Sequence, residues 1–216
     1  LKHLVEYDDV MNSQREIIYA KRRKYLEGNE LRAEIEEMFS EELSAIVASQ
    51  TDARTGVVNL EEVQKITAEL IPLDKEWASK LDTKVSELIT DDLMNKTKKA
   101  IDRRQTEVGN DLLNLLFKMV CLKTIDSAWL QHLETMEHLR EGIGLRGYGQ
   151  RDPLVEYKAE AYRLFNSLLA EIRFEVVNTV LKVNIQVQPE ELENTNTEIT
   201  EGAQLAETAM QQSARR

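Results

Sequence analysis

The feature that most constrains this chain is a long apolar stripe over residues 110–141. Its members recur at alternating steps of three and four residues: Leu112, Leu115, Met119, Leu122, Trp129, Leu133 and Met136. Asp126 and Arg140 occupy the two slots that break the series. A stripe of this kind is typical of a long helix that packs along a partner helix. The sequence therefore predicts an extended structure built by helix-on-helix packing.

The partner helix is expected directly afterwards, over residues 153–182. Four apolar residues there step by four, three and four: Ala161, Phe165, Leu168 and Ile172. Asp152 before Pro153 is a good helix start, because Asp accepts hydrogen bonds from the free amides and Pro is tolerated at the first helical position. Two long helices with a short connection form an antiparallel hairpin.

A further amphipathic helix is predicted over residues 1–26, where four apolar residues recur every seven positions: Leu4, Met11, Ile18 and Tyr25. Gly28 is expected to break this helix before the pattern resumes to about residue 48. The second half of the first segment is basic and the next segment is acidic. These runs either pair along neighbouring helices or form two solvated faces.

Residues 57–107 are predicted to form a small helical subdomain after a polar loop at 49–56. Asn59 followed by Glu62 indicates a capped helix start, and Pro72 ends the helix that follows it to about Leu70. Residues 75–107 continue as helix, with an expected buried set of Trp77, Leu81, Val85, Leu88, Leu93 and Ile101.

The C-terminal part is expected to be different in kind. Residues 183–187 (VNIQV) alternate apolar and polar side chains, which is compatible with a short strand. From Pro189 onward the chain is rich in Glu, Thr, Asn and Gln, so a flexible tail is expected.

No run of the sequence approaches the roughly 18 to 20 apolar residues of a membrane span. The chain opens without Met and in mid-pattern, as expected for part of a longer protein.

Charge and cysteine content narrow the class of protein. The formal net charge is −11, which argues against a nucleic-acid binder with a basic face. The single cysteine, Cys121, cannot form an internal disulfide, and we expect it to be a small buried residue. Trp129 is also expected in the core.

The connection between the two long helices, GIGLRGYGQRDP at residues 142–153, is the most specialised segment. It holds four glycines, at 142, 144, 147 and 149, around Leu145, Arg146 and Tyr148. One interpretation is a mobile tip that presents an amphipathic ring and positive charge to passing polypeptide. The other is a turn whose Tyr148 packs back on the helices. A phosphate-binding loop is disfavoured, because no strand precedes the glycines and no GKS or GKT follows.

Two other groups of residues could form sites. His132 and His138 lie six residues apart, on different sides of a helix, and Glu134 with His138 is too few ligands, so no metal site is predicted. Asp8 and Asp9 form a carboxylate pair whose simplest explanation is the favourable dipole at a helix start.

Two runs of the chain resemble SecA preprotein translocase motors. The first is EYDDVMNSQREIIYAKRRKYLEG at 6–28, and the second is KTIDSAWLQHLETMEHLREGIGLRGYGQRDPLVEYKAEAYRLF at 123–165. The resemblance covers roughly residues 1–188 and is weak over 50–107. It implies a helical scaffold over 1–48, a helical wing over 49–109 and a two-helix finger over 110–182. The short strand at 183–188 and the flexible linker over 189–216 are predicted from the residue pattern itself.

The resemblance also implies a function. The parent protein would couple ATP hydrolysis to pushing unfolded preproteins through the SecYEG channel, from the cytoplasm and as a peripheral protein on the inner face of the bacterial plasma membrane. The fingertip residues that would contact preprotein and channel are Leu145, Arg146, Gly147, Tyr148 and Gly149. Asp8, Asp9, Gln14 and Arg15 would couple to the parent's nucleotide-binding and preprotein-crosslinking domains.

The family's catalytic parts have no counterpart in this sequence: the phosphate loop, the acidic metal-binding motif and the arginine fingers. ATP and Mg²⁺ are therefore expected in the parent and no cofactor in this part. The family's cysteine-rich zinc motif is also absent from the tail. The alternative function is a free-standing helical adaptor that binds a protein partner.

Overall fold

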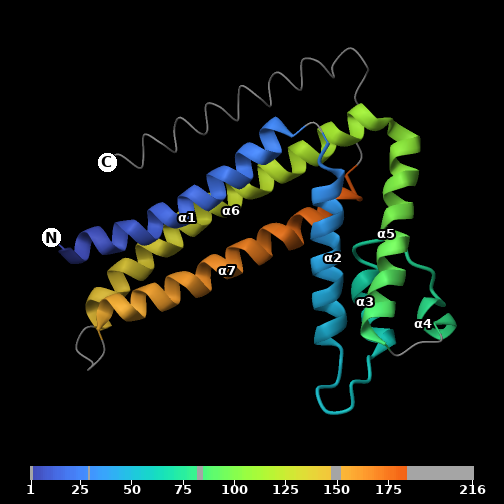
Figure 1. Cartoon of the computed structure of the whole chain (residues 1–216), viewed down its shortest axis with the longest axis horizontal. Helices are drawn as coiled ribbons and strands as arrows, with labels where there is room; N and C mark the ends of the chain where they lie inside the picture. The colour runs from blue at the N-terminus through green and yellow to red at the C-terminus, as the bar shows by residue number, and fades with distance from the viewer. Residues whose placement is uncertain (1, 29, 82–84, 147–151, 184–216) are drawn as a thin grey trace. The chain divides into compact units, whose positions relative to one another are not determined.

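The computed structural model of the chain describes residues 2–28, 30–81, 85–146 and 152–183 (Figure 1). For residues 2–5 and 144–146 it describes the backbone alone. The helices in these ranges are α1 (Lys2–Glu27), α2 (Arg32–Ser49), α3 (Leu60–Thr67), α4 (Trp77–Lys80), α5 (Ser86–Val108), α6 (Asn110–Arg146) and α7 (Pro153–Val180). The prediction of an all-α chain is confirmed. The predicted strand beyond Val183 and the predicted tail lie outside the described residues.

The chain divides into two compact units. The bundle unit contains residues 1–28 and 121–172, and the wing unit contains residues 29–120 and 173–216. The predicted break at Gly28 is confirmed, because α1 ends at Glu27 and the Gly28 amide donates to the carbonyl of Lys24 at 3.0 Å. The functional division at residues 48, 109 and 182 stays a prediction. None of the helices in the described ranges is long and apolar enough to span a membrane.

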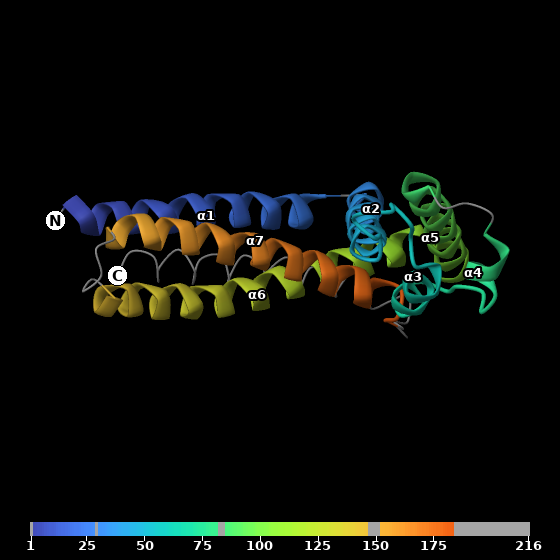
Figure 2. The ribbon, with the colours of Figure 1, turned by 90° about the horizontal axis from the view of Figure 1, so that it is seen from below.

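In the bundle unit, α1, the second part of α6 and the first part of α7 lie side by side (Figure 2). Tyr7 and Gln14 of α1 meet Tyr157 and Ala161 of α7 in the same order along the chain, so α1 and α7 are parallel. Arg22 of α1 meets Asp126 of α6, which shows that these two helices run in opposite directions, since Gln14 meets the later residue His132.

The predicted apolar stripes form most of the core of the bundle unit. Ile18 and Tyr25 of the seven-residue repeat are buried, as are Trp129, Met136 and the four predicted residues of α7: Ala161, Phe165, Leu168 and Ile172. Cys121 is buried too, as expected. Burial of these side chains is the main way in which the apolar pattern stabilises the bundle unit. Each Å² of apolar surface removed from water contributes about 25 cal/mol.

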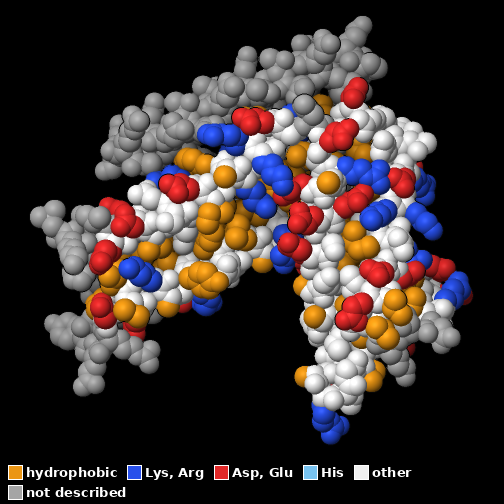
Figure 3. Space-filling model, in the orientation of Figure 1, with side chains coloured by type: hydrophobic (Ala, Val, Ile, Leu, Met, Phe, Trp, Pro, Cys, Tyr) orange, Lys and Arg blue, Asp and Glu red, His pale blue; other side chains and the backbone are white. Residues whose placement is uncertain are grey.

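The wing unit is built around α2 and α5, which pack against each other. Arg32 at the start of α2 pairs with Asp102 near the end of α5 at 2.7 Å, so these helices are antiparallel. The acidic part of α2 pairs with α7, because Arg173 binds Glu41 and Glu42, each at 3.0 Å. On the face seen in Figure 3, acidic and basic side chains are interspersed and not separated by sign.

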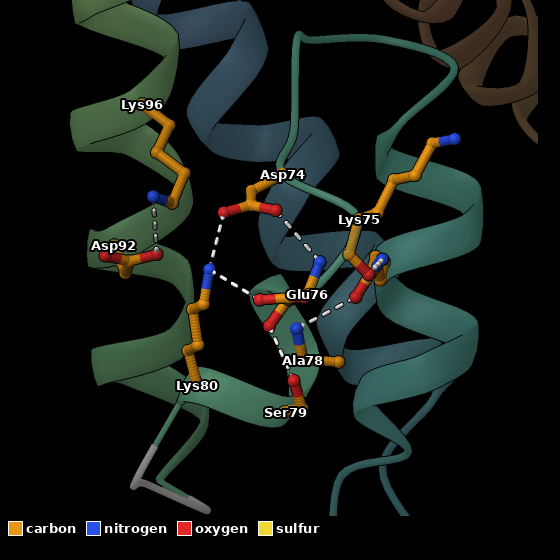
Figure 4. A network of polar contacts seen from close by, with 9 residues as sticks. Asp74, Lys75, Glu76, Ala78, Ser79, Lys80, Asp92 and Lys96 are labelled. Carbon is orange, nitrogen blue, oxygen red and sulfur yellow. Dashed lines mark hydrogen bonds and ion pairs between the residues drawn. The ribbon is translucent and has the colours of Figure 1, made fainter.

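Short polar contacts hold α3 and α4 in the wing unit (Figure 4). Gln64 of α3 donates to the carbonyl of Lys75 at 2.6 Å and accepts from the amide of Ala78 at 2.8 Å. The buried Trp77 donates its indole N–H to Asp92 of α5 at 2.6 Å. Together with the buried Trp77 ring, these bonds hold a helix of four residues that is too short to be stable by itself.

The predicted buried set of residues 75–107 is wrong at two positions. Val85 and Leu88 are exposed, while Ile89 and Thr97 are buried. The helix begins only at Ser86, and the face that meets α2 is set by the four-residue steps Ile89, Leu93, Thr97 and Ile101. Thr97 can be buried because its hydroxyl donates to the carbonyl of Leu93 at 2.9 Å.

The connection between α6 and α7 is shorter than predicted. The helix α6 continues to Arg146, so Gly142 is helical and not part of a loop. Ile143 explains the extra turn, because it is buried among apolar side chains of the bundle unit. The predicted start of α7 is confirmed: the Asp152 carboxylate accepts from the amide of Leu154 at 2.9 Å, and Pro153 is the first helical residue.

The Asn59 cap gives a first test. The Asn59 side chain accepts from the amide of Glu62, as predicted, and satisfies one free donor of α3. We expect Asn59→Ala to lower the free energy of unfolding by about 1 kcal/mol in urea titrations followed by circular dichroism. The exposed Glu69→Ala in the same unit serves as control and should change it by less than about 0.5 kcal/mol. Equal effects would contradict the cap.

The helical state of Gly142 gives a second test. A Cβ at Gly142 meets nothing within 4 Å, so Gly142→Ala should stabilise the chain by about 0.5–1 kcal/mol through a lower backbone entropy of unfolding. Gly109 is the matched control: a Cβ there is equally unopposed, but its φ is 85°. Gly109→Ala should destabilise by about 1 kcal/mol or more. Thermal melting that gives both variants the same sign would contradict this assignment.

Candidate functional site

The predicted fingertip lies at the free end of the hairpin formed by α6 and α7. Gly147, Tyr148 and Gly149 fall outside the described residues, and Leu145 and Arg146 form the end of α6 by their backbone. The structure therefore describes the stem of the tip on both sides, up to Arg146 and from Asp152.

A buried apolar cluster joins α6 and α7 close to the predicted fingertip. Met136 and Ile143 of α6 pack with Tyr157 and Ala161 of α7. Around them lie partly buried side chains from all three helices: Tyr7, Val10, Met11, Leu139 and Leu164. The rings of Tyr7 and Tyr157 meet edge to face with centroids 4.5 Å apart. Burial raises the pKa of Tyr157 to about 12, because the ionised phenolate would lose its hydration inside this cluster.

Gln14 lies inside the bundle unit. Its side chain is 6% exposed, its Nε2 donates to the backbone carbonyl of Ala161 at 3.1 Å, and its Oε1 lies 2.8 Å from Nε2 of His132. Because the amide nitrogen is already a donor, His132 must donate to the amide oxygen, which places a proton on Nε2. One side chain of α1 thus binds both helices of the hairpin.

His132 is a core residue. Its ring stacks on Trp129 with centroids 5.5 Å apart and lies 5.9 Å from the ring of Phe165. Burial lowers the pKa of His132, so the neutral imidazole is favoured. Within the described ranges, no group of three or more His, Cys, Asp or Glu residues is arranged to hold a metal ion.

The other residues assigned to coupling lie on the outside of α1. Asp8 and Asp9 are exposed, and Arg15 donates to Asn12 at 2.6 Å. The helix-dipole explanation for the two aspartates is wrong, because α1 begins at Lys2 and its first turn contains no acidic residue. The dipole effect falls off within the first turn, so it does not account for them.

A partly buried ion pair was not predicted. Arg22 is 2% exposed, and its Nε and Nη2 donate to the two carboxylate oxygens of Asp126 at 2.7 and 3.2 Å. The sequence held one signal for it, since Asp126 breaks the apolar stripe at a slot that faces a partner helix. The second break, Arg140, is exposed and binds Glu137 of its own helix at 2.9 Å. The same pattern therefore had two different causes.

Comparisons with known proteins identify the family of the chain. The family model of the SecA Wing and Scaffold domain matches residues 2–184. The protein translocase subunit SecA of Geobacter sp. (strain M21) is 40% identical over 197 residues, 88% of this chain and 20% of that protein. Its counterpart in Dehalococcoides mccartyi is 40% identical over 189 residues, 87% of this chain and 20% of that protein.

A third relative, the SecA translocase subunit of Pelobacter propionicus, is 39% identical over 195 residues, 89% of this chain and 22% of that protein. The chain thus spans about a fifth of the length of these relatives. Since the family model covers nearly all described residues, the chain belongs to the SecA Wing and Scaffold domain family.

Proposed function

We propose that this chain is the non-catalytic scaffold, wing and finger part of an ATP-driven motor that pushes unfolded preproteins through the SecYEG channel. The observation that carries the proposal is the stiff hairpin of α6 and α7. It is packed along α1 and closed by the Ile143 and Tyr157 cluster next to the segment that holds Tyr148. The relatives are named as protein translocase subunits, which supports the same reading.

The tip supplies the contact with polypeptide in this proposal. A tyrosine ring has an apolar face and a hydroxyl that hydrogen-bonds, so Tyr148 can contact segments of very different sequence. Leu145 adds apolar surface and Arg146 adds positive charge beside it. Gly147 and Gly149 leave backbone amides uncovered for hydrogen bonds to an extended chain.

The energy source lies elsewhere in the parent protein. ATP and Mg²⁺ bind to its nucleotide-binding domains, and the exposed Asp8 and Asp9 together with Arg15 face those domains and the preprotein-crosslinking domain. Gln14, which is buried, acts inside the bundle unit. The parent works from the cytoplasm, as a peripheral protein on the inner face of the plasma membrane.

The tip is tested by Tyr148→Ala in the full-length protein. Losing one aromatic contact of about 1.4 kcal/mol should lower preprotein import into inverted membrane vesicles about tenfold. Thermal stability and ATP binding should stay unchanged. Tyr148→Phe should keep most of the activity, and Tyr162→Ala, which removes a 70%-exposed tyrosine of α7, is the matched control. Import that is unaffected by Tyr148→Ala would favour the adaptor alternative.

The location of the motor chemistry is tested on the chain alone. The purified 216 residues should neither bind ATP in isothermal titration calorimetry nor release phosphate from it. The full-length protein is the positive control. Specific ATP turnover by the purified chain would show that the catalytic parts are not confined to the remainder.

A further inference from the structure

The seam between α1 and the hairpin carries two polar contacts whose side chains from α1, Gln14 and Arg22, are buried. Gln14 binds His132 and Ala161, and Arg22 binds Asp126. The two contacts lie eight residues apart along α1, which is roughly 12 Å of helix. Ile18, which is buried, lies between them.

The apolar part of this seam does not define one axial position. Met11, Ile18 and Tyr25 recur every seven residues, so a slide of α1 by one heptad again places apolar side chains against an apolar surface. Apolar burial has no directional preference, and contacts of this kind tolerate more than one register. A polar side chain in such a seam is the common way to select one register.

The polar contacts of this seam can select one register of α1. A slide of one turn, roughly 5 Å, would break the 2.7 Å bond from Arg22 to Asp126 in its present geometry and would separate the buried guanidinium from a carboxylate that is 26% exposed. Gln14 is selective in a second way, because it donates to Ala161 of one helix and accepts from His132 of the other. Both helices must be at the correct level for this amide to be satisfied.

We propose that Gln14 and the Arg22–Asp126 pair are positioning residues that fix the axial register of α1 against the hairpin. When α1 moves along its axis, the hairpin and its tip therefore move with it, because α1 does not slide against them. The transfer of displacement from α1 to the tip rests on the proposed function, whereas the register of α1 concerns the bundle unit alone and can be measured without transport.

The register is measured by electron spin distances in the full-length protein. Spin-labelled unnatural amino acids replace Ile17 of α1, Leu130 of α6 and Val155 of α7, which are 50%, 55% and 63% exposed, and Cys121 stays unchanged. Along the bundle axis, Val155 lies close to Tyr7, because the Tyr7 ring contacts Tyr157, which is two residues further along α7. The pair 17–155 is therefore offset by roughly 15 Å along the bundle, and a slide changes its distance. The pair 130–155 reports the hairpin alone.

The test variant carries Gln14→Leu, Arg22→Met and Asp126→Leu, which replace the polar contacts by apolar side chains of similar size. We expect a second 17–155 distance population at a register shifted by about one turn or one heptad, roughly 5 or 10 Å along the axis. The 130–155 distance should not change. Ile18→Leu, an apolar exchange between the two contacts, is the control and should keep one population.

A folded triple variant with a single, unshifted 17–155 distance would overturn the proposal. If the triple variant melts below the assay temperature, Gln14→Leu alone and Arg22→Met with Asp126→Leu are measured in its place. A single unshifted distance in both overturns the proposal in the same way.

Transport gives the second readout. With two registers equally populated, preprotein imported per ATP hydrolysed should fall by about half, while ATP hydrolysis itself continues. A shifted register with unchanged coupling would refute the force-transfer step but leave the register assignment standing. If Tyr148→Ala also leaves import unchanged, the failure lies with the proposed function and not with the register.

Discussion

The packing of Met136 and Ile143 on Tyr157 and Ala161 is the interaction on which the rest of the bundle unit depends. It joins the two helices of the hairpin in the last turns before the tip. Without it, α6 and α7 would separate at the end where a contact with polypeptide would be made. It also forms the surface on which Tyr7, Val10 and Met11 of α1 rest, so the third helix is aligned by the same cluster.

The polar contacts do a different kind of work from this cluster. A partly buried ion pair such as Arg22–Asp126 gains attraction but loses hydration, and its net contribution to stability is often small. The same holds for a buried amide such as Gln14, whose bonds replace bonds to water. Stability alone therefore gives little reason to place these residues in an apolar seam. Their directional bonds distinguish one alignment of the helices from its neighbours.

Much of the fold could be predicted from the sequence because the helices are long and their periodicity is sustained. The heptad of Ile18 and Tyr25, the stripe through Trp129 and Met136, and the Asn59 cap rest on local rules that tertiary contacts do not override here. Val85 and Leu88 were misassigned because a short, weakly patterned stretch leaves the helix start open. One residue of error there rotates the buried face away from the correct side.

The site was harder to predict than the fold. Gln14 reads as an ordinary surface residue in a polar stretch, and only its neighbours from α6 and α7 make it a core residue. The extra turn of α6 was missed because four glycines suggested a loop, although Ile143 can hold Gly142 in a helix. For Tyr148, the choice between an outward tip and a packed turn stays a prediction, since that residue lies outside the described ranges.

The small side chain of Ala161 limits what residue 161 can be. Its side chain is fully buried, and its carbonyl accepts from the Gln14 amide at 3.1 Å, so a single methyl group lies beside the point where a side chain of α1 reaches the backbone of α7. A larger side chain at 161 would overpack a closed interior and displace its neighbours. The volume at this position is therefore limited from above, whereas the bond to Gln14 depends only on the backbone of residue 161.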